Sequence, residues 1–383
     1  MKIPSSKKIG IIGGGQLGKM LLEAASPWNM DIAIIENDEH APAAKLTQKF
    51  TIGDIKSDDD VYQFGKDKDV ITYEIEHISI SGLDKLEAIG VEVIPKAEVL
   101  KIIHNKAIQK QFYTSNNIPT APYCVATNAQ EFEKFINTCV EEKVVVKAKT
   151  GGYDGKGVQI LAKSEALKLI SNFDEYLLEQ CVPEIIEYSV IVAVGSGEIK
   201  SFPMVEMFFN PKTNLVEFLY SPTHASEVVE QKCREIAENA AAKLNSKGLF
   251  AVELIVTGDQ IYVNEIAPRP HNSGHHTIEG AITSQFEQLN RILLGMPLGE
   301  TDMIKPTAMI NLVGAEGQNG NYALKYTEEL MKMSEVYVHL YNKSTIKPHR
   351  KMGHINLMAN TLPELMEKAK KVKELCEFEL INS

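Results

Sequence analysis

Residues 8–36 constrain the fold more than any other part of the sequence. An apolar segment (KIGII), a glycine turn, a helical run (QLGKMLLEAASPW) and a second apolar segment (DIAIIE) follow one another there. This order predicts a βαβ unit. The short apolar runs DVITYE and VEVIP continue the pattern to residue 95. We therefore expect residues 1–100 to form a doubly wound, Rossmann-like α/β domain.

The glycine turn has more than one interpretation. Gly13, Gly15 and Gly18 have GxGxxG spacing, and Glu36 ends the next strand where a ribose-binding acid would sit. Alone, this spacing is typical of a dinucleotide site. Any tight turn that presents backbone N–H groups to a phosphate needs the same glycines, however. A nicotinamide or flavin nucleotide, another phosphate ligand and a purely structural turn therefore all stay open.

The pattern changes after residue 101. NKAIQKQFYTSN predicts a helix, which the two prolines of IPTAPY must end. VVVKAK, YLLEQCV, YSVIVAV, FAVELIVT and QIYVNEI then read as strands without regular crossover helices, which predicts an antiparallel α+β region over residues 101–298. AMINLVG, VYVHLYN and HINLMAN, followed by a helix near EKAKKVKEL, predict a small β-rich domain over residues 299–383.

Composition excludes several classes of protein. The 383 residues are 44% hydrophobic and 24% charged, as in a globular protein with two or three domains. The net charge of −11 disfavours nucleic acid and anionic membranes as partners. No segment has the roughly eighteen apolar residues of a membrane span or the h-region of a signal peptide. Five cysteines without CxxC spacing favour a reducing cytoplasm.

A second glycine cluster, KTGGYDGKGV at residues 149–158, follows the strand that carries Lys147. It is no Walker loop, because neither serine nor threonine follows Lys156. A glycine loop next to a lysine can close over a triphosphate, where backbone N–H groups and the ammonium offset the oxygen charge. Four glycines exceed what a hairpin turn needs, so we expect a mobile nucleotide lid.

Two pairs of glutamates lie on predicted strands. Glu179 and Glu187 could bind ribose hydroxyls or an exocyclic amine, while the backbone of Gln180–Val182 reads adenine, although two solvated edge carboxylates would look the same. Glu253 and Glu265 lie in apolar strands, where an unpaired charge is costly. Mg²⁺, which takes one or two carboxylates together with phosphate and water, explains this second pair better than a chance surface pair does.

The loop APRPHNSGHHT follows directly after Glu265. Zinc is disfavoured, because neither a cysteine set nor an HExxH helix lies nearby. A polar loop framed by prolines, next to a metal-bound phosphate, instead predicts an anion and substrate pocket. A satisfied polar turn is the alternative.

The order of these motifs resembles the ATP-grasp superfamily, and within it the N5-carboxyaminoimidazole ribonucleotide synthetases. The matching blocks are GGGQLGKML, NKAIQKQF with IPTAPY, VVVKAKTGGYDGKGV, LEQCV, NEIAPRPHNSGHHT with SQFEQ, and HRKMGHIN. The resemblance implies a Rossmann-like domain, an ATP-grasp domain with a mobile lid and a small C-terminal domain, in a homodimer. The implied reaction carboxylates aminoimidazole ribonucleotide with ATP, Mg²⁺ and bicarbonate through carboxyphosphate in purine biosynthesis, for a downstream mutase.

The resemblance also implies a role for each matching residue. ATP would be bound by Lys106, Lys147, Gly152, Tyr153, Asp154, Gly155, Lys156, Gly157, Val158, Glu179, Gln180, Cys181, Val182, Glu187, Asn264 and Glu265. Mg²⁺ would be bound by Glu253 and Glu265. The catalytic residues would be Tyr153, Asp154, Lys156, Arg269, His271, Asn272 and Ser273. The ribonucleotide would be bound by Gln16, Leu17, Glu74 or Glu76, Lys343 and Arg350.

Two departures and several rival functions remain. Lys156 stands where the family often has arginine, and Phe209 lies where the family often has a histidine. The rivals are an ATP-grasp ligase acting on glycinamide ribonucleotide or biotin, an NAD-dependent oxidoreductase and an inactive binding module. RPHNSGH and HRKMGH favour the imidazole substrate, whereas NAD would leave GGYDGKG and the glutamate pair without a role.

Overall fold

The N-terminal part is a parallel α/β layer. The computed structural model describes residues 7–151 and 157–381. Five parallel strands have the order β3-β2-β1-β4-β5. They are β1 (Lys8–Ile12), β2 (Asp31–Glu36), β3 (Phe50–Ile52), β4 (Val70–Tyr73) and β5 (Glu92–Val93), with helices α1 (Gln16–Ala25), η1 (Ser26–Trp28), α2 (Asp58–Gly65) and α3 (Ile80–Ala88). The predicted doubly wound domain is confirmed.

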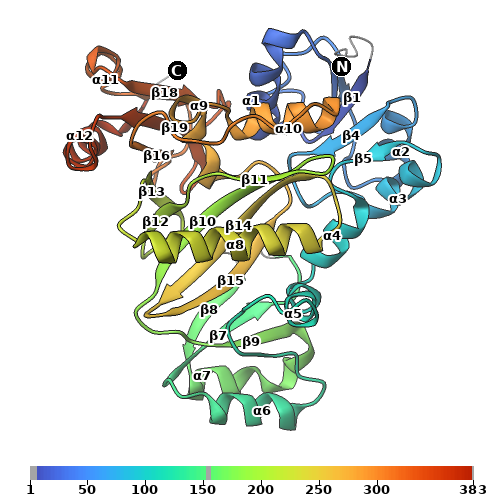
Figure 1. Cartoon of the computed structure of the whole chain (residues 1–383), viewed down its shortest axis with the longest axis vertical. Helices are drawn as coiled ribbons and strands as arrows, with labels where there is room; N and C mark the ends of the chain where they lie inside the picture. The colour runs from blue at the N-terminus through green and yellow to red at the C-terminus, as the bar shows by residue number, and fades with distance from the viewer. Residues whose placement is uncertain (1–6, 152–156, 382–383) are drawn as a thin grey trace.

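A second, antiparallel sheet forms the lower end of the molecule in Figure 1. Its strand order is β6-β9-β7-β8. Its strands are β6 (Tyr123–Cys124), β7 (Lys143–Ala148), β8 (Val158–Ala162) and β9 (Tyr176–Gln180). Helices α4 (Ala97–Ile103) and α5 (Lys106–Ser115) lead to it, and α6 (Ala129–Thr138), α7 (Lys163–Ala166) and η2 (Leu167–Glu175) belong to it. Phe132 and Ile136 of α6 and Val144 of β7 share its core.

The largest sheet is antiparallel throughout and joins the middle of the chain to its end. Its order is β15-β14-β10-β12-β13-β16-β19-β18, with β11 paired to β10. The strands are β10 (Ile186–Val194), β11 (Ile199–Ser201), β12 (Val205–Phe209), β13 (Val216–Ser221), β14 (Gly248–Thr257), β15 (Gln260–Ala267), β16 (Thr307–Val313), β18 (Val336–Leu340) and β19 (Lys351–Met358). Because β13 pairs with β16, the sheet continues across the boundary expected at residue 299.

The remaining elements surround this sheet. They are α8 (Glu227–Lys243), η3 (Asn272–Gly274), α9 (Thr277–Gly280), α10 (Gln285–Leu294), α11 (Thr327–Lys332), α12 (Leu362–Leu375), and the small pair β17 (Tyr322–Leu324) and β20 (Phe378–Leu380). No helix among the described residues is long and apolar enough to cross a membrane. Helix α8 packs on β10 and β14, and α12 packs on β16 and β19.

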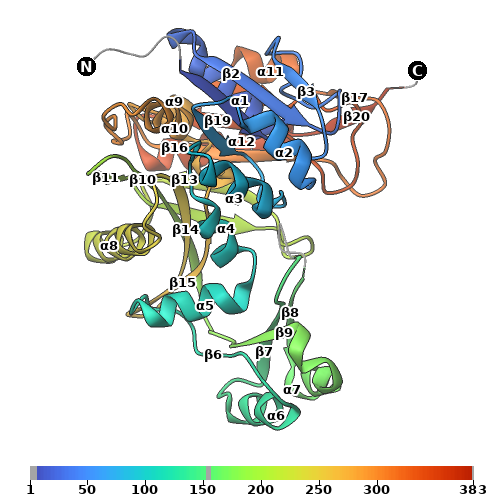
Figure 2. The same ribbon diagram turned by 90° about the vertical axis from the view of Figure 1, so that its right-hand side faces the viewer.

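Helix α10 joins the N-terminal layer to the large sheet. It packs against α1 on one side and against β10 and β14 on the other. Leu21 of α1, Leu289 of α10 and Leu249 of β14 are buried in one core. Figures 1 and 2 show α10 next to α1, above the strands of the large sheet. This shared core fixes the glycine turn relative to the loop that follows β15.

Candidate active site

Five predicted nucleotide-site residues meet between the two antiparallel sheets. Lys147 of β7 is 6% exposed, and its Nζ donates to Asn264 Oδ1 of β15 at 2.9 Å. The same Nζ lies 2.9 Å from Glu179 Oε1 on β9. Lys106, the first residue of α5, pairs with Glu265 Oε2 at 2.6 Å. Two ammonium groups from two different elements thus lie near the same strands, as a polyphosphate site requires.

Glu179 is bound by a second lysine that the sequence analysis missed. Its Oε2 lies 3.2 Å from Nζ of Lys110, which is 2% exposed and donates to Thr120 Oγ1 at 2.6 Å. Burial lowers the pKa of Lys110 to about 8. Burial alone would raise the pKa of Glu179, but Lys147 and Lys110 outweigh it and lower that pKa. The Glu179 carboxylate is thus held by two lysines, and its contact with a nucleotide stays a prediction.

The carboxylates of Glu187, Glu253 and Glu265 lie close together beside these lysines, and we call them the acidic floor. Glu253 of β14 lies directly across from Glu265 of β15, and Glu187 lies on the neighbouring β10. Burial raises the pKa of Glu253 to about 8, and the negative charges of Glu265 and Glu187 add to this shift. The Lys106 ammonium is the main cause that lowers the pKa of Glu265 to about 2. Burial also raises the pKa of Glu187.

A cation would relieve this crowding. Within residues 7–151 and 157–381, the structure has no group of three or more histidine, cysteine or acidic side chains that could hold a metal ion. The two facing carboxylates of Glu253 and Glu265 are oxygen donors of the kind that Mg²⁺ takes, together with phosphate and water. Their role as the protein ligands of this ion stays a prediction.

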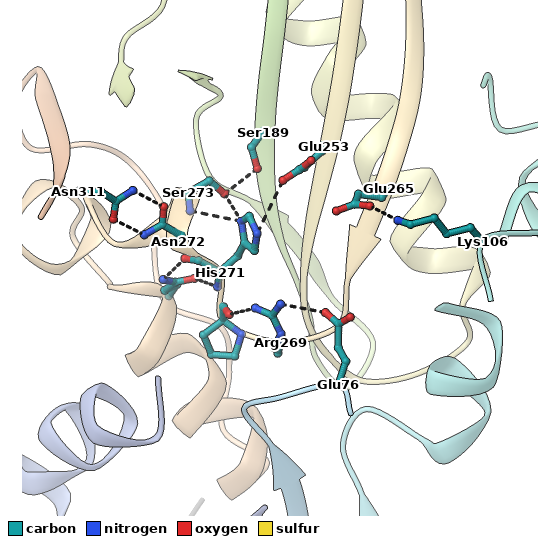
Figure 3. Close-up of polar contacts among 12 residues, drawn as sticks. Glu76, Lys106, Ser189, Glu253, Glu265, Arg269, His271, Asn272, Ser273 and Asn311 are labelled. Carbon is teal, nitrogen blue, oxygen red and sulfur yellow. Dashed lines mark hydrogen bonds and ion pairs between the residues drawn. The ribbon is translucent and has the colours of Figure 1, made fainter. Parts of the chain in front are cut away.

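The loop after β15 reaches this acidic floor (Figure 3). The His271 ring contacts Ser273 Oγ through Nδ1 at 2.9 Å, and its Nε2 lies 3.7 Å from Glu253 Oε1. Ser273 Oγ in turn lies 2.7 Å from Ser189 Oγ on β10. Asn272 is 8% exposed and exchanges two side-chain hydrogen bonds, of 2.9 and 2.7 Å, with Asn311 of β16. The loop is thus tied to two strands of the large sheet.

The two candidate acids of the TYEIEH segment have different surroundings. Glu74 is 7% exposed and accepts hydrogen bonds from the backbone N–H groups of Gly15, Leu17 and Gly18 at 2.8, 3.1 and 3.2 Å. Burial raises its pKa. Glu76 instead pairs with Arg269, at the start of the loop after β15, at 3.0 Å (Figure 3). Glu74 is thus used within the protein, and contact of Glu76 with a substrate stays a prediction.

The glycine turn holds the protein's own carboxylate. A Cβ on Gly15 would lie 2.7 Å from Glu74 Oε1, so glycine is needed for this close approach. Glu36 Oε2 accepts from the Gly14 N–H at 2.9 Å. Carboxylates therefore occupy the helix N-terminus where a dinucleotide would place its pyrophosphate. The N–H of Leu17 is used in the same way, and its side chain lies in the core.

Three predicted substrate residues, distant in the sequence, line one cavity of about 1100 Å³. They are Gln16 of α1, Lys343 and Arg350. Other basic residues in the wall are Lys212, Lys347, His349 and Lys351. Arg350 donates through Nη1 to the carbonyl of Thr345 at 2.8 Å. A second cavity of about 600 Å³, over β1, β2 and β3, contains none of the predicted residues.

The predicted lid is described only at its edges. Gly152, Tyr153, Asp154, Gly155 and Lys156 lie outside the described residues. Gly157 has a φ of +83°, which favours glycine, and its carbonyl accepts from the Ala148 N–H at 2.8 Å. Val158 begins β8, next to Lys147 in the register of β7. The segment predicted to be the lid therefore rejoins the described chain beside Lys147, and its role as a lid stays a prediction.

The segment expected to read adenine follows β9. The Gln180 N–H donates to the Pro122 carbonyl at 2.8 Å. Cys181 and Val182 are half-buried, and burial raises the pKa of the Cys181 thiol. Contacts of these residues with a nucleotide stay predictions.

Four buried polar residues of the site were not predicted. They are Lys110, Ser189, Gln285 and Asn311. Lys110 lies one helical turn after Lys106 on α5, and Ser189 and Asn311 interrupt the apolar runs YSVIVAV and AMINLVG. A polar residue inside an apolar run needs a partner, and this was the usable signal. Gln285 carried no such signal, because its partners lie in another loop.

Three known domain families match the chain, one after another. Residues 6–104 match the ribonucleotide synthetase preATP-grasp domain, residues 111–286 the ATP-grasp domain, and residues 307–368 the phosphoribosylaminoimidazole carboxylase C-terminal domain. An N5-carboxyaminoimidazole ribonucleotide synthase from Saccharolobus solfataricus is 33% identical, across 96% of this chain and 95% of its own. The chain belongs to the N5-carboxyaminoimidazole ribonucleotide synthase family of ATP-grasp ligases.

Other members of the family support this membership. A phosphoribosylaminoimidazole carboxylase from Vigna aconitifolia is 35% identical over 93% of this chain, which spans 65% of that longer protein. The synthetase structure from Thermotoga maritima has a TM-score of 0.88 at 35% identity and covers 98% of this chain and 100% of its own. An Aspergillus clavatus synthase, solved with ADP and aminoimidazole ribonucleotide, has a TM-score of 0.87 at 29% identity and covers 97% and 99%.

Proposed function

We propose that this protein carboxylates 5-aminoimidazole ribonucleotide to N5-carboxyaminoimidazole ribonucleotide with ATP and bicarbonate, in purine biosynthesis. One observation carries the proposal. Two converging lysines and a carboxylate pair lie beside the loop at residues 268–276. Asn272 of this loop bonds to Asn311, which donates to the carbonyl of Val216 in the wall of the basic cavity that Gln16, Lys343 and Arg350 also line. The Aspergillus clavatus synthase, described with ADP and aminoimidazole ribonucleotide, supports the same pair of ligands.

Lys106 and Lys147 bind the polyphosphate in this proposal. Each is now paired with a carboxylate, at 2.6 and 2.9 Å respectively, so its ammonium is already oriented before ATP arrives. When bound by Glu253 and Glu265, Mg²⁺ supplies positive charge at the transferring phosphoryl group. Repulsion among the floor carboxylates makes this position favourable for a cation.

The proposed chemistry has two steps. A bicarbonate oxygen attacks the γ-phosphorus of ATP, and ADP leaves, which gives carboxyphosphate. The exocyclic amine of the ribonucleotide then takes the carboxyl carbon, phosphate leaves, and the amine loses a proton. Arg269 and His271, which are each about one-fifth exposed, bind the anionic intermediate and exclude water from it. A covalent protein nucleophile is not needed.

Further parts of the proposal rest on the sequence and the resemblance. They are a magnesium ion, bicarbonate as co-substrate, a homodimer, a cytoplasmic location, transfer of the product to a downstream mutase, and the division at residues 1–100, 101–298 and 299–383. The acidic floor supports the proposed magnesium ion.

The decisive assay is phosphate release from ATP and bicarbonate, with and without aminoimidazole ribonucleotide. We expect release to need the ribonucleotide and to match formation of its N-carboxylated product. Glycinamide ribonucleotide with formate, and biotin, are matched alternative substrates and should give no coupled release. Coupling to either, or quenching of NADH fluorescence at micromolar protein, would refute the proposal in favour of the corresponding rival.

A further inference from the structure

The side chain of Gln285, the first residue of α10, binds backbone groups of the loop at residues 268–276. We call this loop the catalytic loop, because four of the predicted catalytic residues lie in it. The side chain is fully buried. Its Oε1 accepts from the His271 N–H at 2.9 Å, and its Nε2 donates to the His271 carbonyl at 2.8 Å. One amide group thus satisfies both backbone groups of one residue. Two such bonds fix the position and the orientation of the His271 backbone together.

The loop is shaped to fit this amide. A Cβ on Gly274 would lie 2.4 Å from Gln285 Oε1, so only glycine lets the loop pass this closely. Nε2 also contacts His275 Nδ1 at 3.1 Å, and the Gln285 N–H donates to Thr277 Oγ1 at 2.9 Å. The side-chain amide therefore contacts the loop at His271 and at His275, on both sides of Asn272 and Ser273.

The position of the His271 backbone decides where its ring lies. The ring is held at Nδ1 by Ser273, which contacts Ser189, and its Nε2 faces Glu253 at 3.7 Å. Figure 3 shows the His271 ring directed toward Glu253. A shift of the backbone would carry the ring away from the carboxylate floor.

Helix α10 extends the effect to the N-terminal layer. Asn290 on α10 is fully buried, and its Nδ2 donates to the Leu21 carbonyl of α1 at 3.1 Å. Gln16, which lines the basic cavity, is the first residue of α1. The same helix therefore sets the catalytic loop and one wall of the substrate cavity.

We infer that Gln285 is a positioning residue for the carboxylation reaction, which acts by fixing the backbone of His271 relative to the carboxylate floor and the substrate cavity. This inference rests on the proposed function. It assigns no contact with substrate to Gln285 itself. Its role is to keep the loop in the geometry that the second step requires.

Gln288 provides a matched control on the same helix. It is also fully buried, and its amide pairs with both backbone groups of Gly299, at 2.8 and 2.9 Å. Gly299 lies outside the predicted site. Gln285→Met and Gln288→Met therefore remove the same kind of amide from the same helix, and the loss of thermal stability should be similar in the two variants.

The two variants should differ in activity. Gln285→Met should lower kcat of the ribonucleotide-dependent reaction about ten- to a hundredfold and leave KM for ATP within about twofold, because Lys106 and Lys147 are untouched. Gln288→Met should keep the parent kcat. Gln285→Glu, whose protonated carboxyl offers the same acceptor and donor, should recover activity relative to Gln285→Met, most at low pH.

Hydrogen exchange tests the positioning without relying on turnover. Exchange of the His271 amide should accelerate in Gln285→Met and not in Gln288→Met, where the Gly299 amide should accelerate instead. A His271 amide that keeps its parent rate, or an equal loss of kcat in both methionine variants, would overturn the inference. A parent protein with no ribonucleotide-dependent turnover would refute the proposed function alone, and the exchange rates would then decide this inference.

Discussion

Glu179→Gln should cause a large loss of free energy of unfolding, and the structure lets us work out its magnitude. Glu179 is 4% exposed, and its two oxygens lie 2.9 Å from Nζ of Lys147 and 3.2 Å from Nζ of Lys110. Glutamine keeps the volume of the side chain and removes its charge. Two buried ammonium groups, 7% and 2% exposed, would then lack their common counter-ion.

The expected magnitude follows from these distances. At an effective dielectric constant of about 20, each contact contributes about 5 kcal/mol of Coulomb attraction. Desolvation of the buried ions offsets much of it, and removal of one partner from a buried ion pair costs about 3–5 kcal/mol. Glu165 pairs with the exposed Lys168 at 2.6 Å in the same part of the chain, so Glu165→Gln is the control and should cost less than about 1 kcal/mol.

Local hydrogen exchange is the appropriate assay. The single tryptophan, Trp28, lies in the N-terminal layer and would not report on the four-stranded sheet. Amides of β7 and β9 should exchange about a hundredfold to several thousandfold faster in Glu179→Gln, which corresponds to the expected loss of about 3–5 kcal/mol. KM for ATP should also rise, because Lys147 loses the group that orients it.

The pH dependence gives a second check. Glu179 raises the pKa of Lys110, which burial lowers to about 8 in the parent, so the variant pKa lies below about 8. In the folded state, Lys110 therefore loses its proton at a lower pH in Glu179→Gln than in the parent. The unfolded chain keeps this proton, so the free energy of unfolding of the variant rises with pH over this range while that of the parent does not. The difference in free energy of unfolding between parent and variant should therefore narrow as pH rises toward about 8. Exchange in Glu179→Gln that matches Glu165→Gln at neutral pH would refute the reasoning.

Three further predictions concern Arg350, which lines the basic cavity, and the carboxylates Glu265 and Glu253 of the acidic floor. Arg350→Lys should raise KM for aminoimidazole ribonucleotide about ten- to a hundredfold and leave KM for ATP unchanged, because lysine cannot form paired hydrogen bonds with a phosphate. An unchanged KM for the ribonucleotide would contradict a role of Arg350 in binding its phosphate. Glu265→Gln should abolish ATP turnover with Mg²⁺ while circular dichroism stays the same, and parent-level turnover would contradict the ligand assignment. Glu253→Gln should stabilise the metal-free protein increasingly between pH 4.5 and about 8, because the native carboxyl must stay protonated over a range where the unfolded one ionises; its thermal midpoint in EDTA should exceed that of the parent more at pH 8 than at pH 5, and equal differences would count against the raised pKa.

Much of this protein was predictable from local patterns. The βαβ run at residues 8–36, the lysine before the glycine cluster and the glutamates inside apolar strands each depend on neighbours a few residues away. Periodicity and turn chemistry act over this range, so the strands and helices formed where the pattern placed them. The order of the motifs added the family, because that order is itself a property of the sequence.

Tertiary structure decided which groups are used and how. Glu74 and Glu76 are two residues apart, yet one fills a helix N-terminus and the other pairs with Arg269, in a segment that has left the sheet after Tyr73. Gln16 and Arg350 line one cavity only because α10 binds α1 to the sheet that β16 and β19 extend. Gln285 acts on a loop fourteen residues earlier through hydrogen bonds alone. Such pairings depend on which surfaces pack together in space, and a local sequence pattern holds no information about that.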